Sequence, residues 1–210
     1  MKILYQLQKL LILGEIMKKI LIAISGKAKS GKNTVAELIA HHSGFDKNKI
    51  SIVAIADPMK KILQLMFPEA SPKCLYGPSE FRSEIIHSKY TDKYGKPLTH
   101  RQALLDIGAR GRAYNDDIWL NILDNDVKKS DDILVYIVSD ARFINELTFL
   151  KKAGFTMIRV QREDISKIND VSELEQDKVP NSFFNYIIDN NISFDELSSL
   201  IKDLVLELKK

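Results

Sequence analysis

A glycine-rich segment directly after an apolar run constrains the fold of this sequence more than any other feature. Residues 20–24, ILIAI, form an apolar run that is too short for a helix, which predicts a strand buried on both faces. The segment SGKAKSGKNT follows at residues 25–34, and an apolar stripe over residues 35–39 then predicts a helix. Strand, glycine loop and helix in this order are the setting in which Gly26 and Gly31 build a phosphate-binding loop.

The residue types in this loop suit the chemistry of phosphate groups. Gly26 and Gly31 let the backbone curl so that successive N–H groups point into one concavity, and the following helix adds its positive end. Lys32 supplies an ammonium group for the β- and γ-phosphates of a nucleotide. A structural glycine turn is the alternative, and the buried strand before the loop argues against it. We therefore expect ATP to bind at Gly26, Ala28, Ser30, Gly31, Lys32, Asn33 and Thr34.

The rest of the sequence alternates between predicted strands and helices. Apolar runs at 50–56, 133–138, 155–161 and 185–189 predict four further strands. Because strands that alternate with helices form mostly parallel sheets covered on both faces, we expect an α/β fold with three layers and a five-stranded sheet. Thr99 and Ser193, each with Gln or Glu three residues later, predict capping boxes. Helices are expected from Asp57 toward Pro68, at about 80–89, from Thr99 through Ile107, at about 116–129 and 143–153, and after Ser193.

Length and composition fit one globular domain with an insertion. A chain of 210 residues is long enough to bury a substantial core. The first apolar run is broken by Gln, Lys and Glu and is too short to span a bilayer, while MKKILIAISG, from Met17, has the pattern of a complete first strand. The expected organisation is an appendage at 1–16, a core at 17–57 and 130–210, a helical insertion at about 58–129, and a polar, loop-like segment at about 162–182.

Charge and cysteine content narrow the class of function. The chain carries 31 Lys and Arg against 28 Asp and Glu, a net charge of +3, which is less than a dedicated nucleic-acid-binding protein usually shows. Small anionic ligands account for this bias equally well. The single cysteine, Cys74, cannot form an internal disulfide, which is compatible with a reducing compartment. We expect no stable binding to nucleic acid, no membrane span and a cytoplasmic location.

Two acidic residues follow predicted buried strands, the position at which nucleotide sites hold Mg²⁺ directly or through water. Asp140 follows ILVYIVS, and we expect it to act at such a site. Asp57 follows IVAIA, but an Asp before a proline, here Pro58, is also a common helix cap. The sequence leaves these two roles of Asp57 open.

The arginines indicate a second substrate that carries phosphate. The chain has 24 lysines and 7 arginines, so an arginine marks a position where forked donors are needed, as in bidentate binding of phosphate. All seven lie between Arg82 and Arg162, and they are too many for one nucleotide. Arg159 alternates within a strand and is expected to be structural, whereas Trp119 has two alternatives, packing in a core or stacking on a base. The residues expected to bind this second substrate are Asp57, Arg82, Arg112, Trp119 and Arg142.

Five segments together resemble a known family. The chain from Met17 onward is similar to the deoxynucleoside monophosphate kinases of large phages, within the P-loop kinase superfamily, and more distantly to animal-type phosphomevalonate kinases. The resemblance implies a P-loop NTPase fold and ATP-dependent phosphorylation of a deoxynucleoside or nucleoside monophosphate with Mg²⁺. It also implies the host cytoplasm for a viral protein, and it leaves a homodimer open. The segments are SGKAKSGKNT, ADPMKK, THRQALLDIGARGRAYNDDIWLNIL, VSDARFINE and VSELEQD.

The resemblance also accounts for the unusual residue after the loop lysine. In that family this residue is commonly Asp and the next is Thr, so Thr34 matches and Asn33 differs from the family pattern by one charge. The resemblance implies that Asn33, Thr34 and Asp140 lie near Mg²⁺ or its waters. A weakly active or inactive member is the alternative that Asn33 raises. The expected catalytic residues are Lys32, Asp140, Arg142 and Arg162. The resemblance further implies a kinase domain in which the insertion at about 58–129 binds the acceptor, with Lys60 facing it, and residues 162–182 form a lid that carries Arg162.

Two other functions remain open from the sequence. A phosphomevalonate-type kinase would combine the same phosphate-binding loop with a different acceptor pocket. A phosphate-loop ATPase that acts on nucleic acid would carry a water-positioning Glu directly after the strand-end acid. This sequence has Ala141 and Arg142 there, which favours a kinase.

Overall fold

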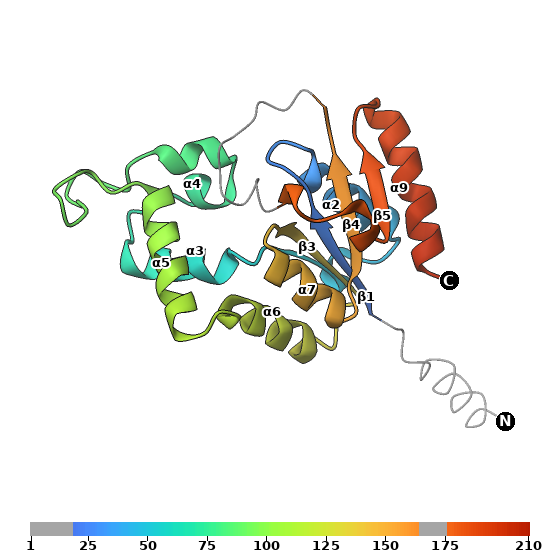
Figure 1. Ribbon diagram of the computed structural model, residues 1–210, viewed down its shortest axis with the longest axis horizontal. Coiled ribbons are helices and arrows are strands. Elements are labelled where there is room, and N and C mark those ends of the chain that lie inside the picture. Colours follow the sequence, from blue (N-terminus) through green and yellow to red (C-terminus); the bar gives the residue numbers. More distant parts are fainter. Residues whose placement is uncertain (1–18, 164–175) are drawn as a thin grey trace. The chain divides into compact units, whose positions relative to one another are not determined.

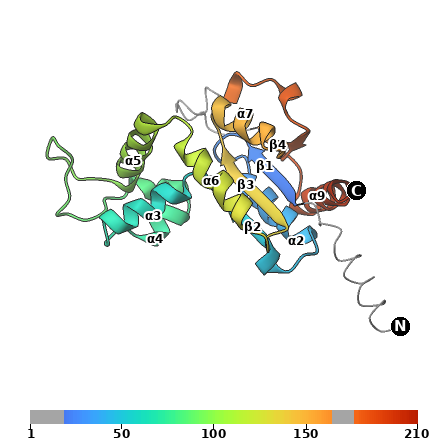
Figure 2. The ribbon, with the colours of Figure 1, turned by 90° about the horizontal axis from the view of Figure 1, so that it is seen from below.

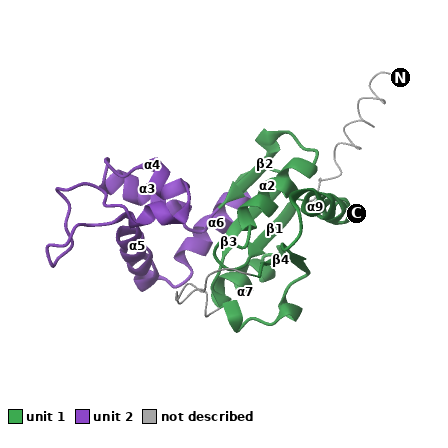
Figure 3. Cartoon of the chain, turned by 90° about the horizontal axis from the view of Figure 1, so that it is seen from above, with its two compact units in different colours: residues 1–53, 129–210 green, residues 54–128 purple. Residues whose placement is uncertain are grey.

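The computed structural model describes residues 19–163 and 176–210. The chain divides into two compact units (Figure 3): the first ends at Val53 and resumes at Lys129, and the second runs from Ala54 to Lys128. The expected appendage at 1–16 lies outside the described residues, as does most of the expected lid, since residues 164–175 are not described.

The first unit is built on a five-stranded sheet whose neighbouring strands all run parallel (Figure 1). The strand order is β2-β3-β1-β4-β5, so β1, the first strand in the chain, lies at the centre. This confirms the α/β fold class and the five-stranded parallel sheet. The strands are β1 (Ile20–Ser25), β2 (Ile50–Val53), β3 (Val135–Ala141), β4 (Thr156–Gln161) and β5 (Tyr186–Asp189).

Helices cover both faces of this sheet and give three layers. Figure 2 shows α2 (Lys32–His42) and α9 (Phe194–Leu208) on one side of the strands and α7 (Ile144–Lys152) on the other. Because side chains alternate along a strand, one apolar set of each strand faces α2 and α9. The main core on that face includes Ile22, Ile24, Ile137, Ile158 and Val160 from the strands, with Val35, Ile39, Leu197 and Ile201 from the two helices.

The carboxyl ends of the central strands lie next to the glycine loop. Ser25, the last residue of β1, pairs with Ala141 of β3 and with Arg159 of β4. The register with β3 shifts between Ala23 and Ser25, where β3 contains one extra residue. Such a bulge bends a strand and re-aims its side chains, and here it falls at Ser139 and Asp140.

The second unit is helical and has a core of its own. Its helices are α3 (Asp57–Met66), α4 (Pro72–Tyr76), α5 (His100–Tyr114) and most of α6 (Ile118–Lys129), with the 3-10 helix η2 (Ser79–Ser83) between α4 and α5. Helices α3 and α5 pack together, and their buried side chains share a cluster with those of α4. The cluster contains Leu63, Ala70, Leu75, Ile86, Leu98 and Ala103.

Three sequence expectations about these elements are wrong. The helix expected at 80–89 is only η2, because the chain then extends and the Ile86 N–H donates to the Leu98 carbonyl at 2.9 Å. Ile85 is exposed while Ile86 is buried, an alternation typical of extended chain rather than helix. Strand β2 ends at Val53 instead of reaching residue 56, and β3 begins two residues later than expected and continues through Ala141.

The capping predictions are confirmed in most respects. The Ser193 hydroxyl accepts the Glu196 N–H, and the Glu196 carboxylate accepts the Ser193 N–H, which completes a capping box on α9. The Thr99 hydroxyl accepts the Gln102 N–H at 3.2 Å, but the Gln102 amide donates to Asp106 instead of returning to Thr99.

Of the helices in the described ranges, none combines the length and the apolar character that crossing a bilayer requires.

Candidate functional site

The phosphate-loop candidate has a backbone that only glycine fits at two positions. Gly26 and Gly31 have φ values of 152° and 97°, which residues other than glycine rarely adopt. A Cβ on Gly26 would lie 2.4 Å from the Val160 carbonyl oxygen, and one on Gly31 would lie 2.2 Å from the Asn190 amide nitrogen. The neighbouring strands β4 and β5 therefore determine the shape of the loop as much as the loop itself does.

The Lys32 side chain folds back across this loop. Its ammonium group donates to the carbonyl oxygens of Gly26 and Lys27, each at 2.6 Å, and only 8% of the residue is exposed. Helix α2 begins at Lys32 after Gly31, and no side-chain hydrogen bond caps its first turn. The free N–H groups of a first turn and a nearby ammonium form an electrostatic setting that attracts anions. Two buried hydroxyls at the loop, those of Ser25 and Ser30, have no hydrogen-bond partner among the described residues.

Asn190 fixes the loop from the far edge of the sheet. Its side-chain amide donates to the Ser30 carbonyl at 2.8 Å, and its backbone N–H donates to the Gln161 carbonyl at 2.8 Å. The sequence expectations did not include Asn190. Its position directly after the buried strand β5 is the signal that could have found it, because the carboxyl ends of parallel strands meet at one edge.

Asp140 and Arg142 also lie at the carboxyl ends of the strands, beside the start of the loop. Asp140 lies inside β3 rather than after it, next to the bulge and one residue before Ala141, which pairs with Ser25. Arg142 follows the strand and is half-buried. Asp140 therefore lies close to Ser25, the residue directly before Gly26, on the neighbouring strand of the sheet.

Glu146 holds the turn that carries Arg142. Its carboxylate accepts the N–H groups of Arg142 at 2.8 Å and of Phe143 at 3.1 Å, within the first turn of α7. The pKa of Glu146 is raised to about 7, and burial is the main cause. The nearby Asp140 also raises this pKa, whereas the two N–H groups lower it. Glu146 was not among the residues expected at the site, although its place three residues after Phe143 is typical of a capping residue.

The residues expected near Mg²⁺ offer oxygen atoms of the right kind. Asn33 is exposed and Thr34 half-buried, both in the first turn of α2, and Asp140 lies on β3. Their carbonyl, hydroxyl and carboxylate oxygens suit Mg²⁺, which keeps several waters and takes further ligands from substrate phosphates. In residues 19–163 and 176–210, no three His, Cys, Asp or Glu side chains gather as a metal-binding group. A Mg²⁺ ion that arrives with a nucleotide fits this donor set better than a metal held by the protein alone.

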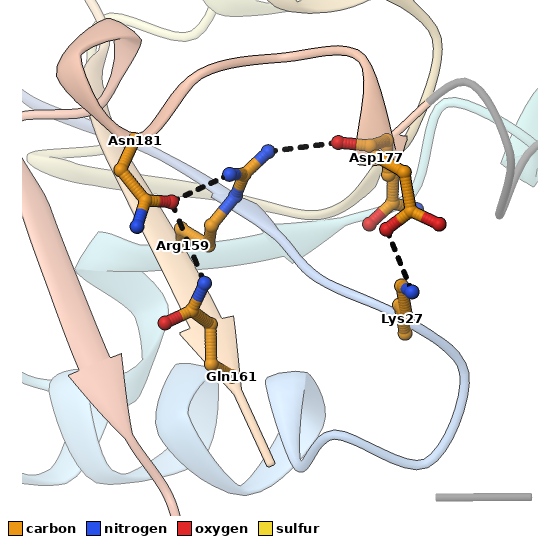
Figure 4. Close-up of polar contacts among 6 residues, drawn as sticks. Lys27, Arg159, Gln161, Asp177 and Asn181 are labelled. Carbon is orange, nitrogen blue, oxygen red and sulfur yellow. Dashed lines mark hydrogen bonds and ion pairs between the residues drawn. The ribbon is translucent and has the colours of Figure 1, made fainter. Parts of the chain in front are cut away.

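A polar network lies beside the loop on the opposite face of the sheet from Ile158 and Val160 (Figure 4). Arg159, 9% exposed, donates to the Asn181 side chain at 2.7 Å and to the Gln176 carbonyl at 3.0 Å, and its guanidinium stacks on Phe184. These contacts agree with the structural role expected for Arg159. Next to Gln176, the Asp177 carboxylate forms an ion pair of 2.7 Å with Lys27 of the loop.

In the second unit, the partly exposed Asp57 and the buried Lys60 form an ion pair at the start of α3. Lys60 is 6% exposed, and its ammonium group lies 2.7 Å from Asp57 Oδ1. Asp57 Oδ2 accepts the Ala54 N–H at 2.8 Å. The helix-cap alternative for Asp57 is wrong, because α3 begins at Asp57 itself and its carboxylate bonds to Ala54 and Lys60 rather than to the helix amides. The Tyr76 ring lies 5.0 Å from the Lys60 ammonium.

The other residues expected to bind the acceptor differ in exposure. Trp119 is 6% exposed, and its indole N–H donates to the Gly108 carbonyl at 3.2 Å, which favours the packing alternative over stacking on a base. Arg112 is exposed on α5, Arg82 is half-buried on η2, and Arg162 is exposed directly after β4. Lys60, Arg82, Arg112 and Trp119 thus belong to the second unit, and Lys32, Asp140, Arg142 and Arg162 to the first.

Comparisons with known proteins agree with a nucleotide-binding site. No protein-family model matches the chain. A protein of Acanthamoeba polyphaga mimivirus, provisionally named deoxynucleotide monophosphate kinase, is 27% identical over 195 residues, which cover 87% of this chain and 94% of that protein. Together with the α/β fold, this distant similarity supports a nucleotide-kinase type of enzyme.

Proposed function

We propose that this protein transfers the γ-phosphoryl group of ATP to a deoxynucleoside monophosphate and forms the diphosphate. The observation that carries the proposal is the loop between β1 and α2, where two sterically required glycines and the folded-back Lys32 provide a setting that favours anions. The similarity to the mimivirus protein, which extends over nearly all of both chains, supports the choice of substrate class. The phage-type segments in the sequence support the same choice.

Phosphoryl transfer depends on positioning the two substrates and neutralising the phosphate charges more than on acid–base catalysis. The acceptor phosphate is already largely dianionic at neutral pH, since its second pKa is about 6. The amides of the loop and Lys32 would hold the ATP phosphates, and Arg142 and Arg162 would stabilise the migrating group. Mg²⁺, held near Asn33, Thr34 and Asp140, would neutralise charge on the phosphates. Acceptor binding is assigned to Asp57, Lys60, Arg82, Arg112, Trp119 and Arg142, where the burial of Trp119 makes it the weakest member.

The arrangement after β3 supports a kinase over a hydrolase. A hydrolase needs a residue that positions the attacking water, and the nearest carboxylate after Asp140 is that of Glu146. This carboxylate accepts two backbone N–H groups at the start of α7 and is thereby committed to holding the turn. Glu146 is therefore not available to position a water molecule for attack on the phosphate.

A coupled assay of ADP formation tests the proposal. The full chain is incubated with ATP, Mg²⁺ and, in separate reactions, each deoxynucleoside monophosphate, each ribonucleoside monophosphate and phosphomevalonate. We expect turnover with at least one deoxynucleotide. Turnover only with phosphomevalonate, or ATP use that depends on DNA and not on a monophosphate, would overturn the proposed substrate class.

A further inference from the structure

A carboxylate is held directly against the phosphate loop. Asp177 Oδ1 lies 2.7 Å from Lys27 Nζ (Figure 4). Lys27 follows Gly26, and its carbonyl oxygen accepts hydrogen bonds from Lys32 and from the Ser30 N–H, so it is an integral part of the loop. Asp177 ends the acidic segment VSELEQD, to which the proposed function gives no role.

The position of Asp177 does not depend on its partner Lys27. The carbonyl of the preceding residue, Gln176, accepts a hydrogen bond from the buried Arg159, and Arg159 also donates to the side chain of Asn181, four residues after Asp177. The chain is thereby attached to β4 through the backbone before Asp177 and through a side chain after it. The ion pair itself is 45% exposed at Lys27 and 57% exposed at Asp177, and pairs that are this exposed contribute little to stability. Its effect therefore falls on the charge around the loop rather than on the fold.

We propose that Asp177 is an internal counter-ion of the phosphate loop and lowers its affinity for nucleotides. While the loop is empty, the carboxylate neutralises Lys27. A polyphosphate that enters the loop meets the negative charge of Asp177 nearby and a Lys27 whose positive charge is already neutralised, so part of its binding energy is lost. Tight binding of the product nucleotide would slow release, a step that limits many kinases, and a counter-ion of this kind keeps binding moderate. The inference rests on nucleotide binding at the loop, as in the proposed function, and not on the identity of the acceptor.

Titration calorimetry with ADP and no acceptor tests this inference. Asp177→Asn keeps the shape of the side chain and removes its charge, and we expect it to lower the Kd for ADP about three- to tenfold at low ionic strength. The gain should shrink as salt is raised from about 50 to 500 mM, because exposed charges are screened. Asp177→Ser should act in the same direction. Unchanged or weaker ADP binding in both variants would overturn the inference.

A second ion pair of the first unit provides a matched control. Asp132, 95% exposed, lies 3.5 Å from Lys49, and these residues come just before β3 and β2, at the amino ends of the strands. Asp132→Asn removes the same charge far from the carboxyl ends, so it should leave ADP affinity unchanged, and an equal gain there would contradict a local effect. A wild-type chain that binds ADP but phosphorylates no monophosphate would contradict the proposed function and leave this comparison intact. A wild-type chain that binds no ADP would overturn both.

Discussion

Asn190 and Ser30 are 160 residues apart in the chain, yet the side-chain amide of Asn190 donates to the Ser30 carbonyl at 2.8 Å. This bond joins the end of β5 to the loop before α2. Asn190→Ala should therefore leave the loop less ordered and weaken ADP binding about three- to tenfold, the equivalent of one net hydrogen bond. Calorimetry with ADP measures the effect. Asn191→Ala is the control, because the Asn191 side chain contacts Asp189 and Glu163 instead of the loop.

Lys32→Met should abolish most of the turnover. The ammonium is the expected partner of the transferred phosphate, and removal of one such donor commonly lowers kcat by about 10²- to 10³-fold. The variant also loses two hydrogen bonds within the loop, so the free energy of unfolding should fall by about 1–2 kcal/mol without loss of the fold. Lys29→Met, at an exposed position of the same loop, should lose much less activity. Equal losses in both variants would mean that general loop charge, and not Lys32, serves the reaction.

Glu146 should make the stability of the protein depend on pH. Its pKa is about 7 in the folded chain and near 4.5 when unfolded, so the folded state binds more protons between these values. The free energy of unfolding should therefore fall as pH rises from about 4.5 to 7, by up to about 3 kcal/mol, and this contribution stays lost above pH 7. Urea titrations of wild type and Glu146→Gln across this range measure the difference. Parallel pH curves for the two proteins would contradict the prediction, and Glu37→Gln, at an exposed position of α2, controls for net charge.

Arg159→Met should destabilise the first unit by about 2–4 kcal/mol. The buried guanidinium satisfies the Gln176 carbonyl and the Asn181 side chain, and methionine leaves both without that donor. Thermal unfolding measures the loss. Arg162→Met, at an exposed position three residues later, should change stability by less than about 0.5 kcal/mol. A small effect at Arg159 would show that water replaces its hydrogen bonds.

Gly111→Ala should destabilise the second unit although alanine favours helices. A Cβ at Gly111 would lie 2.2 Å from the Trp119 ring, so α5 or the indole must shift, at a cost of about 1–3 kcal/mol. Gly108→Ala in the same helix meets only Met59 and Arg112, which are flexible, and should be neutral or stabilising. Denaturant unfolding of both variants tests this contrast. Equal stabilities would mean that the Trp119 pocket adapts freely.

The sequence was sufficient to predict the architecture of the first unit. Continuous apolar runs identify buried strands, and the order of strands and helices implies the parallel sheet. Strand ends were less predictable. Asp140 belongs to β3 because the sheet pairs Ala141 with Ser25. This contact joins distant segments, so the pattern of apolar residues along the chain cannot predict it. The helix expected at 80–89 is replaced by extended chain because Ile86 finds a partner in Leu98, twelve residues away.

The candidate site shows the same division between local and non-local information. The loop residues could be predicted because their spacing is local and their chemistry is specific. Asn190, Asp177 and Glu146 were not among the predicted residues. The positions of Asn190 and Glu146 in the sequence carry a signal, but the hydrogen bond or ion pair through which each of the three residues acts is created by the fold. Trp119 was left open between two roles, and its contact with Gly108 favours packing.

The central place of β1 has a consequence for synthesis and folding. This strand is synthesised before both of its partners, β3 and β4, which lie more than one hundred residues further along the chain. The loop after β1 therefore cannot acquire its final surroundings until those strands exist, and such high contact order slows folding. The second unit is continuous in sequence, from Ala54 to Lys128, and is able to collapse first. Nascent chains halted between β2 and β3 should accordingly contain a protease-resistant helical unit before any nucleotide binding is detectable.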